Sequence, residues 1–269
     1  MENHQPVGPA SEDFLDSRGF YLSISLLVGV LVIVMLSLAL KEGSTAAKLI
    51  LDMTGSDAQL PYPLTIQNGL IIFLALGVGE VLYRRAWIGR ELRAMEARLL
   101  PENPQTVLTP EDVPMLRRKI VTAKAYAPGY IMTVIDQCLV YFETNRSPEN
   151  THQLLNSLVD LELHRADLRY SLLRYLAWLI PTIGFIGTVV GIAGALSFLD
   201  FADGARSSSQ NMEPVVNALA LAFNTTIMAL IFSAILVFLM GGTQRKEEDV
   251  INSCSDYCLR NLVNRLYTP

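Results

Sequence analysis

Long apolar runs separated by charged segments are the dominant pattern along the chain. Four stretches without Asp, Glu, Lys or Arg are long enough for a membrane helix: 20–40, 58–79, 175–199 and 214–244. A helix needs about 20 predominantly apolar residues to cross roughly 30 Å of hydrocarbon. The pattern therefore predicts an all-α, polytopic membrane protein with four transmembrane helices. The second stretch is the least apolar, because it contains Gln67, Asn68 and several glycines.

Composition and charge agree with this prediction and give it an orientation. Hydrophobic residues make up 51% of the chain and charged residues only 17%, against about 25% charged residues in a typical soluble protein. The segments 41–63 and 200–213 contain only Lys41, Lys48 and Arg206, whereas all other Lys and Arg lie on the opposite side of the predicted spans. Since cytoplasmic loops carry an excess of Lys and Arg, both termini are expected in the cytoplasm.

The spans and the charge bias divide the chain into five expected segments. They are a cytoplasmic N-terminal tail (1–18), two transmembrane helices with a short external loop (19–83), a cytoplasmic helical domain (84–169), the third and fourth transmembrane helices (170–244) and a cytoplasmic C-terminal helix (245–269). Thr109 and Ser147 are predicted helix N-caps. Because no Gly or Pro occurs between Pro148 and Pro181, a long helix continuous with the third span is expected.

Leucines repeat along this long helix and form a seam, which Arg165 interrupts. The seam consists of Leu154, Leu158, Leu161, Leu168 and Leu172. Such spacing is typical of a helix that buries one face. The seam packs either inside a small helical domain or against neighbouring subunits, and the sequence leaves both interpretations open.

The third and fourth spans carry small and polar residues on one face each. In the third span these are Gly184, Gly187, Gly191 and Gly194, with Thr188 beside them; in the fourth they are Ala218, Ala222, Thr225, Ala229 and Ser233, with Asn217, Asn224 and Thr226 close by. Small residues let helix backbones approach closely, so tight packing explains the Gly and Ala. The hydroxyls and amides favour a polar path, because polar groups inside a membrane are costly and tend to be functional.

Neither of these two spans contains Asp, Glu, His, Lys or Arg in its interior. An ion carrier normally needs a carboxylate at membrane depth. Glu80 is the one candidate in any span, and we interpret it as an interfacial charge because Arg84 and Arg85 follow it closely. If the protein conducts ions, the titrating group is therefore expected from another polypeptide. Cys138, Cys254 and Cys258 fall on the reducing side, so neither a disulfide nor a metal site is expected.

Two motifs in these spans resemble a known family. The motif Pro-x-x-Gly-x-x-Gly-Thr-Val-x-Gly-Ile at 181–192 resembles the glycine-rich motif of the MotA/TolQ/ExbB proton channel family. The segments 217–219, 222–223 and 225–226 (Asn-Ala-Leu, Ala-Phe and Thr-Thr) are similar to the second channel helix of that family, and the resemblance covers residues 150–245. The four predicted spans match a MotA-like topology, whereas TolQ- and ExbB-like proteins have three spans.

The resemblance implies a motor subunit and not an enzyme. It implies a homopentameric ring in a bacterial cytoplasmic (inner) membrane, with residues 170–244 as the channel domain. Two single-span partners similar to MotB, TolR or ExbD would occupy the lumen, and each would supply an intramembrane Asp. Transported H+ or Na+ would replace any cofactor, and no nucleic acid is involved. Flagellar rotation, outer-membrane energising, gliding and phage defence all remain open as the driven process.

The resemblance also divides the small and polar residues by role. The expected ion-path residues are Thr188, Thr225, Thr226, Asn217, Asn224 and Ser233. The expected helix-packing residues are Pro181, Gly184, Gly187, Gly191, Gly194, Ala218, Ala222 and Ala229. Many members of the family have an acidic residue where this chain has Asn217, and a Thr nearer Ala222. The alternatives are a non-conducting tetraspan scaffold and a small transporter with substrate at the helix break near Pro181.

Overall fold

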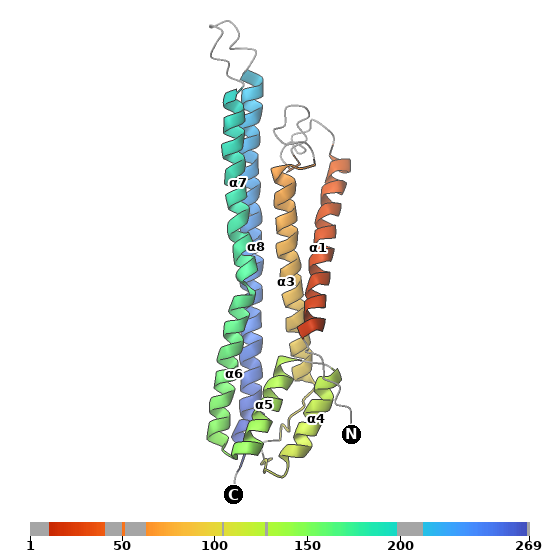
Figure 1. Cartoon of the computed structure of the whole chain (residues 1–269), viewed down its shortest axis with the longest axis vertical. Coiled ribbons are helices and arrows are strands. Elements are labelled where there is room, and N and C mark those ends of the chain that lie inside the picture. The colour runs from red at the N-terminus through yellow and green to blue at the C-terminus, as the bar shows by residue number, and fades with distance from the viewer. Residues whose placement is uncertain are drawn as a thin grey trace, which may run out of the picture. The chain divides into compact units, whose positions relative to one another are not determined.

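A computed structural model describes residues 11–40, 50–51, 63–103, 105–126, 129–197 and 212–267 (Figure 1). Its elements in chain order are α1 (Ser11–Ala39), α3 (Ile66–Glu96), α4 (Val113–Tyr126), α5 (Tyr130–Asn145), α6 (Pro148–Arg169), α7 (Ser171–Ser197), α8 (Met212–Asn261) and the 3-10 helix η2 (Val263–Arg265). Within the described residues the structure is helical apart from turns, short connections and one isolated bridge between Leu108 and Leu266. The all-α prediction is therefore confirmed.

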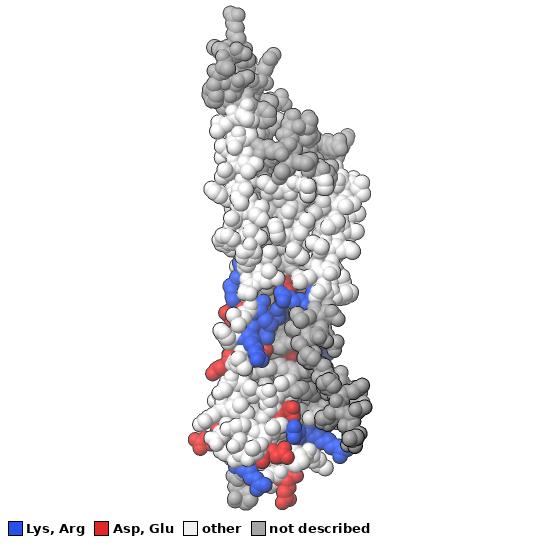
Figure 2. Space-filling model, viewed as in Figure 1, with Lys and Arg blue, Asp and Glu red and all other residues white. Residues whose placement is uncertain are grey.

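The chain folds into two compact units. The apolar unit consists of residues 16–82 and 171–240, and the charged unit consists of residues 1–15, 83–170 and 241–269. Figure 2 shows Lys, Arg, Asp and Glu side chains gathered mainly on the charged unit, whereas the visible side chains of the apolar helices are almost free of charge. Helices α3 and α8 contribute residues to both units.

Four helical segments are long and apolar enough to cross a membrane: Arg18–Ala39, Ile66–Glu96, Pro148–Ser197 and Val215–Arg265. The predicted number of spans is confirmed. The helices nevertheless extend beyond the predicted apolar stretches, since α3 continues past Gly79 and α8 continues past Gln244. A charged residue ends an apolar stretch but does not end the helix. Hydropathy therefore predicts the part of a helix that lies in the membrane, and it does not predict where the helix ends. The predicted start of the second stretch, 58–62, lies outside the described residues.

Small residues let α3 pack closely inside the apolar unit. A Cβ added at Gly29 of α1 would lie 2.8 Å from Cβ of Ala75. A Cβ at Gly77 would lie 2.6 Å from Cδ1 of Leu236 on α8. Both distances are shorter than real Cβ contacts; at Gly29 the backbones would have to move apart, whereas at Gly77 the Leu236 side chain would have to shift. Helix α3 thus contacts α1 on one face and α8 on another.

The charged unit has its own core, and within it a side chain of α3 caps the N-terminus of α5. The core is built from apolar residues of α4, α5, α6 and the end of α8, including the fully buried Ile135 and Phe142. The backbone N–H groups of Tyr130 and Ile131 donate to the carboxylate of Glu91, at 2.8 and 3.3 Å. Glu91 of α3 therefore satisfies two of the N–H groups that the first turn of α5 leaves free.

Three free cysteines, Cys138, Cys254 and Cys258, are buried in this core. Burial raises the pKa of the Cys138 thiol to about 12, so its thiolate is on the order of 1000-fold rarer than for an ordinary cysteine. We expect the folded chain to resist alkylation by N-ethylmaleimide at pH 7.5 and to react at all three positions once denatured. Mass spectrometry of the intact chain measures this. The variant Ser253→Cys, at an exposed position of α8, is the reactive control; fast labelling of a native cysteine would contradict the expectation.

The predicted N-cap of α6 is present, but the predicted seam is not the buried face. The hydroxyl of Ser147 accepts a hydrogen bond from the Asn150 N–H at 3.3 Å. The buried residues of α6 are Thr151, Leu155, Val159, Glu162 and Ala166, whereas Leu161 and Leu168 of the seam are exposed. The seam therefore packs inside the domain only in part: Leu158 contacts the core of the charged unit, whereas Leu161 and Leu168 do not, and Leu155 and Val159 supply the apolar residues of the inner face.

Two helix boundaries also differ from the prediction. Helices α6 and α7 are interrupted at Tyr170, so the long helix is not strictly continuous. Thr109 was predicted to cap a helix that begins at once, but α4 begins only at Val113. The Thr109 N–H and hydroxyl donate to the Asp112 carboxylate at 3.0 and 2.7 Å. These bonds hold the connection before α4 in a turn and lower the pKa of Asp112.

Candidate functional site

The glycine face of α7 is the surface that contacts α8 within the subunit. The residues in closest approach are Gly184, Gly187 and Gly191, and all three are buried. A Cβ at Gly187 would lie 2.6 Å from Oγ1 of Thr225, and one at Gly191 would lie 2.5 Å from Cβ of Ala222. No side chain larger than hydrogen fits such a contact without moving the backbone. Figure 1 shows the two helices side by side along this contact.

Of the remaining residues predicted to pack the two helices, Ala229 and Ala218 lie in this contact and Gly194 does not. Ala229 lies opposite Gly184, and the carbonyl oxygen of Ala218 lies near Gly191, two turns further along α7. Gly194 is only half-buried, and Ala195 has the buried place in that turn. The periodicity of the sequence had indicated Gly194 for this face, because glycine spacing alone does not reveal which neighbouring position turns inward.

Three threonine hydroxyls lie close together in the contact between α7 and α8. We call Thr188, Thr225 and Thr226 the hydroxyl cluster. The Thr226 hydroxyl donates to the Gly184 carbonyl at 3.0 Å, and the Thr225 hydroxyl donates to the Ala222 carbonyl at 2.8 Å. The Thr188 hydroxyl lies 3.2 Å from that same Ala222 carbonyl and contacts the Thr226 hydroxyl. Since a hydroxyl has one proton and two lone pairs, the cluster keeps free acceptor capacity.

The three hydroxyls differ in how far they can be reached from outside the subunit. Thr225 is only 3% exposed, and its Oγ1 lies under Gly187. Thr188 and Thr226 are half-buried and therefore remain accessible at one edge. Of the two positions that the sequence left open, Thr226 is the one that a neighbouring helix or an ion can approach.

The other polar candidates on α8 are arranged differently. Asn217 is exposed and Asn224 is half-buried. The Ser233 hydroxyl donates to the Ala177 carbonyl of α7 at 3.0 Å. In a regular helix this carbonyl would accept from the N–H of residue 181, but Pro181 has no N–H. Ser233 thus supplies the hydrogen bond that the proline removes. The sequence analysis did not predict this role, although Ala177, four residues before Pro181, is the residue whose carbonyl loses its helical donor.

Replacing Ser233 with alanine is expected to destabilise the α7–α8 pair by about 1–3 kcal/mol, the cost of leaving a buried carbonyl unsatisfied. Thermal unfolding of the purified chain measures the change. The double variant Pro181→Ala/Ser233→Ala restores the N–H at position 181 and should recover part of the loss. Equal melting temperatures for the wild type and Ser233→Ala would show that the carbonyl has another donor.

The buried carboxylate of α3 in the apolar unit, Glu80, is paired. Oε2 of Glu80 accepts from Nε of Arg18 at 3.0 Å, and the Glu80 side chain is fully buried. Along α7 and α8 the stretches 175–197 and 215–244 contain no Asp, Glu, His, Lys or Arg. The hydroxyl cluster therefore lies in a part of α7 and α8 that has no carboxylate, imidazole or basic side chain of its own.

A buried charge cluster in the charged unit was not anticipated from the sequence. Its members are Glu162, Arg169, Tyr170 and Glu247. The guanidinium of Arg169 donates to Glu162 at 2.8 Å and to Glu247 at 2.7 Å, and the Tyr170 hydroxyl donates to Glu247 at 2.9 Å. Arg169 also lies over the ring of Trp87, 5.4 Å from its centroid. The sequence alone does not indicate this cluster, since Glu247 of α8 lies 77 residues after Tyr170 at the end of α6.

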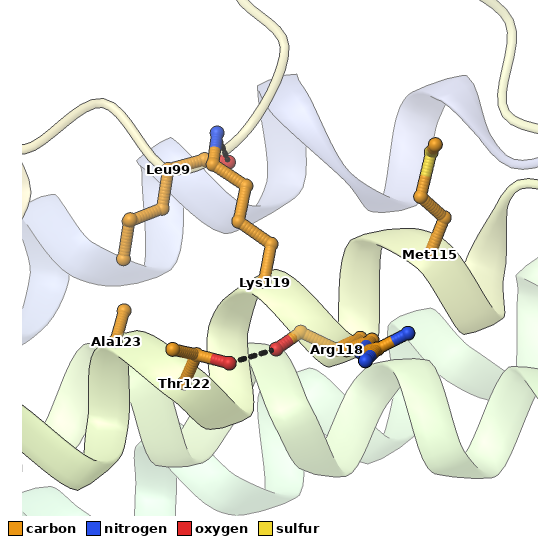
Figure 3. Close-up of a pocket in the computed structure, with 6 residues that line it drawn as sticks. All are labelled: Leu99, Met115, Arg118, Lys119, Thr122 and Ala123. Carbon is orange, nitrogen blue, oxygen red and sulfur yellow. Dashed lines mark hydrogen bonds between the residues drawn. The ribbon is translucent and has the colours of Figure 1, made fainter.

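The recess on α4 shown in Figure 3 has a different chemistry. It has a volume of about 480 Å³ and is lined by Leu99, Met115, Arg118, Lys119, Thr122 and Ala123. Lys119 donates to the Leu99 carbonyl at 3.3 Å, and Thr122 donates to the Arg118 carbonyl at 2.9 Å. Its polar groups are cations and a hydroxyl, so the lining offers no general base and no carboxylate ligand for a metal.

Comparison with known proteins gives one match. Residues 123–255 match the model of the MotA/TolQ/ExbB proton channel family. This range includes α7, the α7–α8 contact and the hydroxyl cluster. The searches of curated proteins and of solved structures found no match to the chain.

Proposed function

Because this chain belongs to the MotA/TolQ/ExbB proton channel family, we propose that it is the ring subunit of an ion-driven motor. Five copies surround two single-span partner helices, and the flow of H+ or Na+ past the partners drives rotation or other mechanical work. The observation that carries the proposal is the hydroxyl cluster, which lies in stretches of α7 and α8 (175–197 and 215–244) that contain no Asp, Glu, His, Lys or Arg. Such helices can orient a carboxyl group but cannot provide one.

The chemistry of the cluster suits a partner that alternates between two charge states. A protonated Asp can donate a hydrogen bond to a threonine oxygen, and a charged Asp can accept one from a threonine hydroxyl. Thr188 and Thr226 lie at an accessible edge of the contact, so these two are the proposed contacts of the partner Asp. The same oxygens suit a partly dehydrated Na+.

Exposed apolar residues on both helices support assembly with further helices. On α7, Phe185 is 65% exposed, and on α8, Phe238 is 79% exposed. Lipid, neighbouring subunits and partner helices together would cover these surfaces in the proposed ring. The leucines exposed on α6, Leu161 and Leu168, are proposed to contact neighbouring subunits in the same way.

The proposed membrane is the bacterial cytoplasmic (inner) membrane, with both termini and the charged unit in the cytoplasm. The excess of Lys and Arg on that side supports this orientation. The energy available is adequate, since one elementary charge that crosses 100 mV releases about 2.3 kcal/mol.

Ion flux measured with and without a partner tests the proposed function. The chain is reconstituted in liposomes alone and together with a single-span protein that has an intramembrane Asp and is encoded by a neighbouring gene. We expect little flux from the chain alone, a complex of five subunits with two partners by native mass spectrometry, and flux that depends on the partner Asp. Specific flux from the chain alone would overturn the proposal, and a stable complex without flux would favour the non-conducting scaffold.

A further inference from the structure

Helix α3 carries a carboxamide that the ion-path assignment does not use. Gln67 lies in the first turn of α3 and is fully buried. Within the described residues, neither its Oε1 nor its Nε2 has a hydrogen-bond partner. Burial of a polar group without a hydrogen bond is unfavourable, and membrane-spanning segments have no bulk water to compensate. An amide that remains here with both atoms free therefore indicates a bound group.

The side chains next to Gln67 do not supply the missing bonds. The Asn68 Nδ2 donates to the Pro63 carbonyl at 2.8 Å, and the Asn68 N–H donates to the Thr65 hydroxyl at 3.3 Å. The Thr65 hydroxyl itself donates to the Leu51 carbonyl at 3.4 Å. Asn68 Oδ1 remains without a partner within the described residues. Two consecutive residues thus present three unpaired polar atoms in the interior of the apolar unit.

The position of Gln67 on α3 places it between two packed faces. Ile66 and Gly77 mark the face toward α7 and α8, because Cδ1 of Ile66 lies 3.3 Å from the Cβ position of Gly187 and Gly77 meets Leu236. Ala75 marks the face toward α1, where it meets Gly29. With 3.6 residues per turn, Gln67 falls between these two directions, and its side chain is fully buried.

The identity of the bound group follows from the two ends of the amide. Oε1 needs a donor and Nε2 needs an acceptor. A bare cation would satisfy only Oε1, and an anion would satisfy only Nε2. A carboxylic acid of a partner offers both, but a side chain that is 0% exposed is closed to a partner helix. Water offers a donor and an acceptor and is small enough to be enclosed.

We propose that Gln67 holds an internal water molecule within the apolar unit, with Asn68 Oδ1 as a further acceptor at the same end of α3. Buried waters typically bond to about three otherwise unsatisfied polar groups, which matches the three free atoms present. The site belongs to α3, and Ile66, the preceding residue, packs on Gly187 beside the hydroxyl cluster. The proposal does not depend on ion conduction.

Radiolytic hydroxyl-radical labelling of the purified full-length chain tests the site. Radicals formed from a bound water oxidise the side chains next to it even when bulk solvent cannot reach them. We expect oxidation within residues 66–71 at least fivefold above that of Leu236, which is equally buried in an apolar contact. The variant Gln67→Leu should reduce this labelling to the Leu236 level, and Ile71→Leu, which leaves the amide in place, should retain it.

An electron cryo-microscopy map at a resolution that shows ordered waters provides the second measurement and does not depend on any variant folding. Density within hydrogen-bond distance of both Gln67 amide atoms supports the proposal. It is overturned if the amide atoms bond to protein groups, if density contacts Oε1 alone and varies with Na+ concentration, or if residues 66–71 are labelled no faster than Leu236.

Discussion

Replacing Thr188 and Thr226 together with valine is expected to reduce ion-driven output at least tenfold while the chain remains in the membrane at its normal level. Valine preserves the shape of threonine but removes the hydroxyl, so the α7–α8 contact survives and the accessible hydrogen-bonding groups do not. Flux in vesicles that contain the chain and its single-span partner measures the effect, and a blot of the membranes measures the protein level.

The matched controls lie on the same two helices. Thr182 of α7 also has a hydroxyl that donates to a backbone carbonyl, that of Trp178 at 2.8 Å, and it lies outside the hydroxyl cluster. Thr182→Val should therefore leave flux nearly unchanged, and Thr188→Ser/Thr226→Ser should retain part of it. Normal flux from the double valine variant at a normal protein level would exclude these hydroxyls from the ion path.

Replacing Glu247 with glutamine is expected to destabilise the charged unit by about 3 kcal/mol or more, the usual cost of removing one partner from a buried ion pair. The Glu247 side chain is fully buried and accepts from Arg169 and from Tyr170. After the substitution Glu162 would be the only carboxylate left to the Arg169 guanidinium among the contacts of this cluster. Arg169 lies over Trp87, so tryptophan fluorescence during thermal unfolding reports directly on the cluster.

A neighbouring position on α8 separates the effect of burial from that of charge. Asp249 is exposed, and an exposed charge contributes roughly 0–1 kcal/mol. Asp249→Asn removes the same charge and should barely change the melting temperature. If Glu247→Gln and Asp249→Asn melt at the same temperature as the wild type, the cluster does not stabilise the charged unit.

The membrane helices could be predicted because hydropathy is averaged over about 20 residues, so that one or two polar residues do not hide a span. Gln67 and Asn68 weakened the second stretch without hiding it. Helix ends were less predictable: α3 and α8 continue beyond the membrane segments with charged residues, which hydropathy excludes but helix formation accepts. The connection before α4 was also mispredicted, because Asp112 binds Thr109 and forms a turn in place of the expected helix start.

The α7–α8 packing contact could be predicted from the sequence, but the arrangement of the polar side chains beside it could not. Glycine spacing identified the contact surface of α7, since close approach of helices requires small side chains. Thr226 is half-buried and Thr225 is buried because of the rotation of α8 about its axis. Two adjacent threonines in the sequence do not specify this rotation. On α6 the spacing of the leucines did not predict the buried face. That face includes Thr151 and Glu162, and a polar residue is buried only when the fold brings it a partner that the sequence pattern does not show.

The hydrogen bond from Ser233 to the Ala177 carbonyl has an evolutionary consequence. A hydroxyl at position 233 is useful only while position 181 lacks an N–H, so the two positions are under joint selection although they are 52 residues apart in the chain. A relative with a residue other than proline at position 181 has no need of a hydroxyl on α8, and drift at position 233 should follow. Paired substitution at these sites would therefore leave a covariation signal that is independent of ion chemistry and specific to the hydrogen bond at the Ala177 carbonyl.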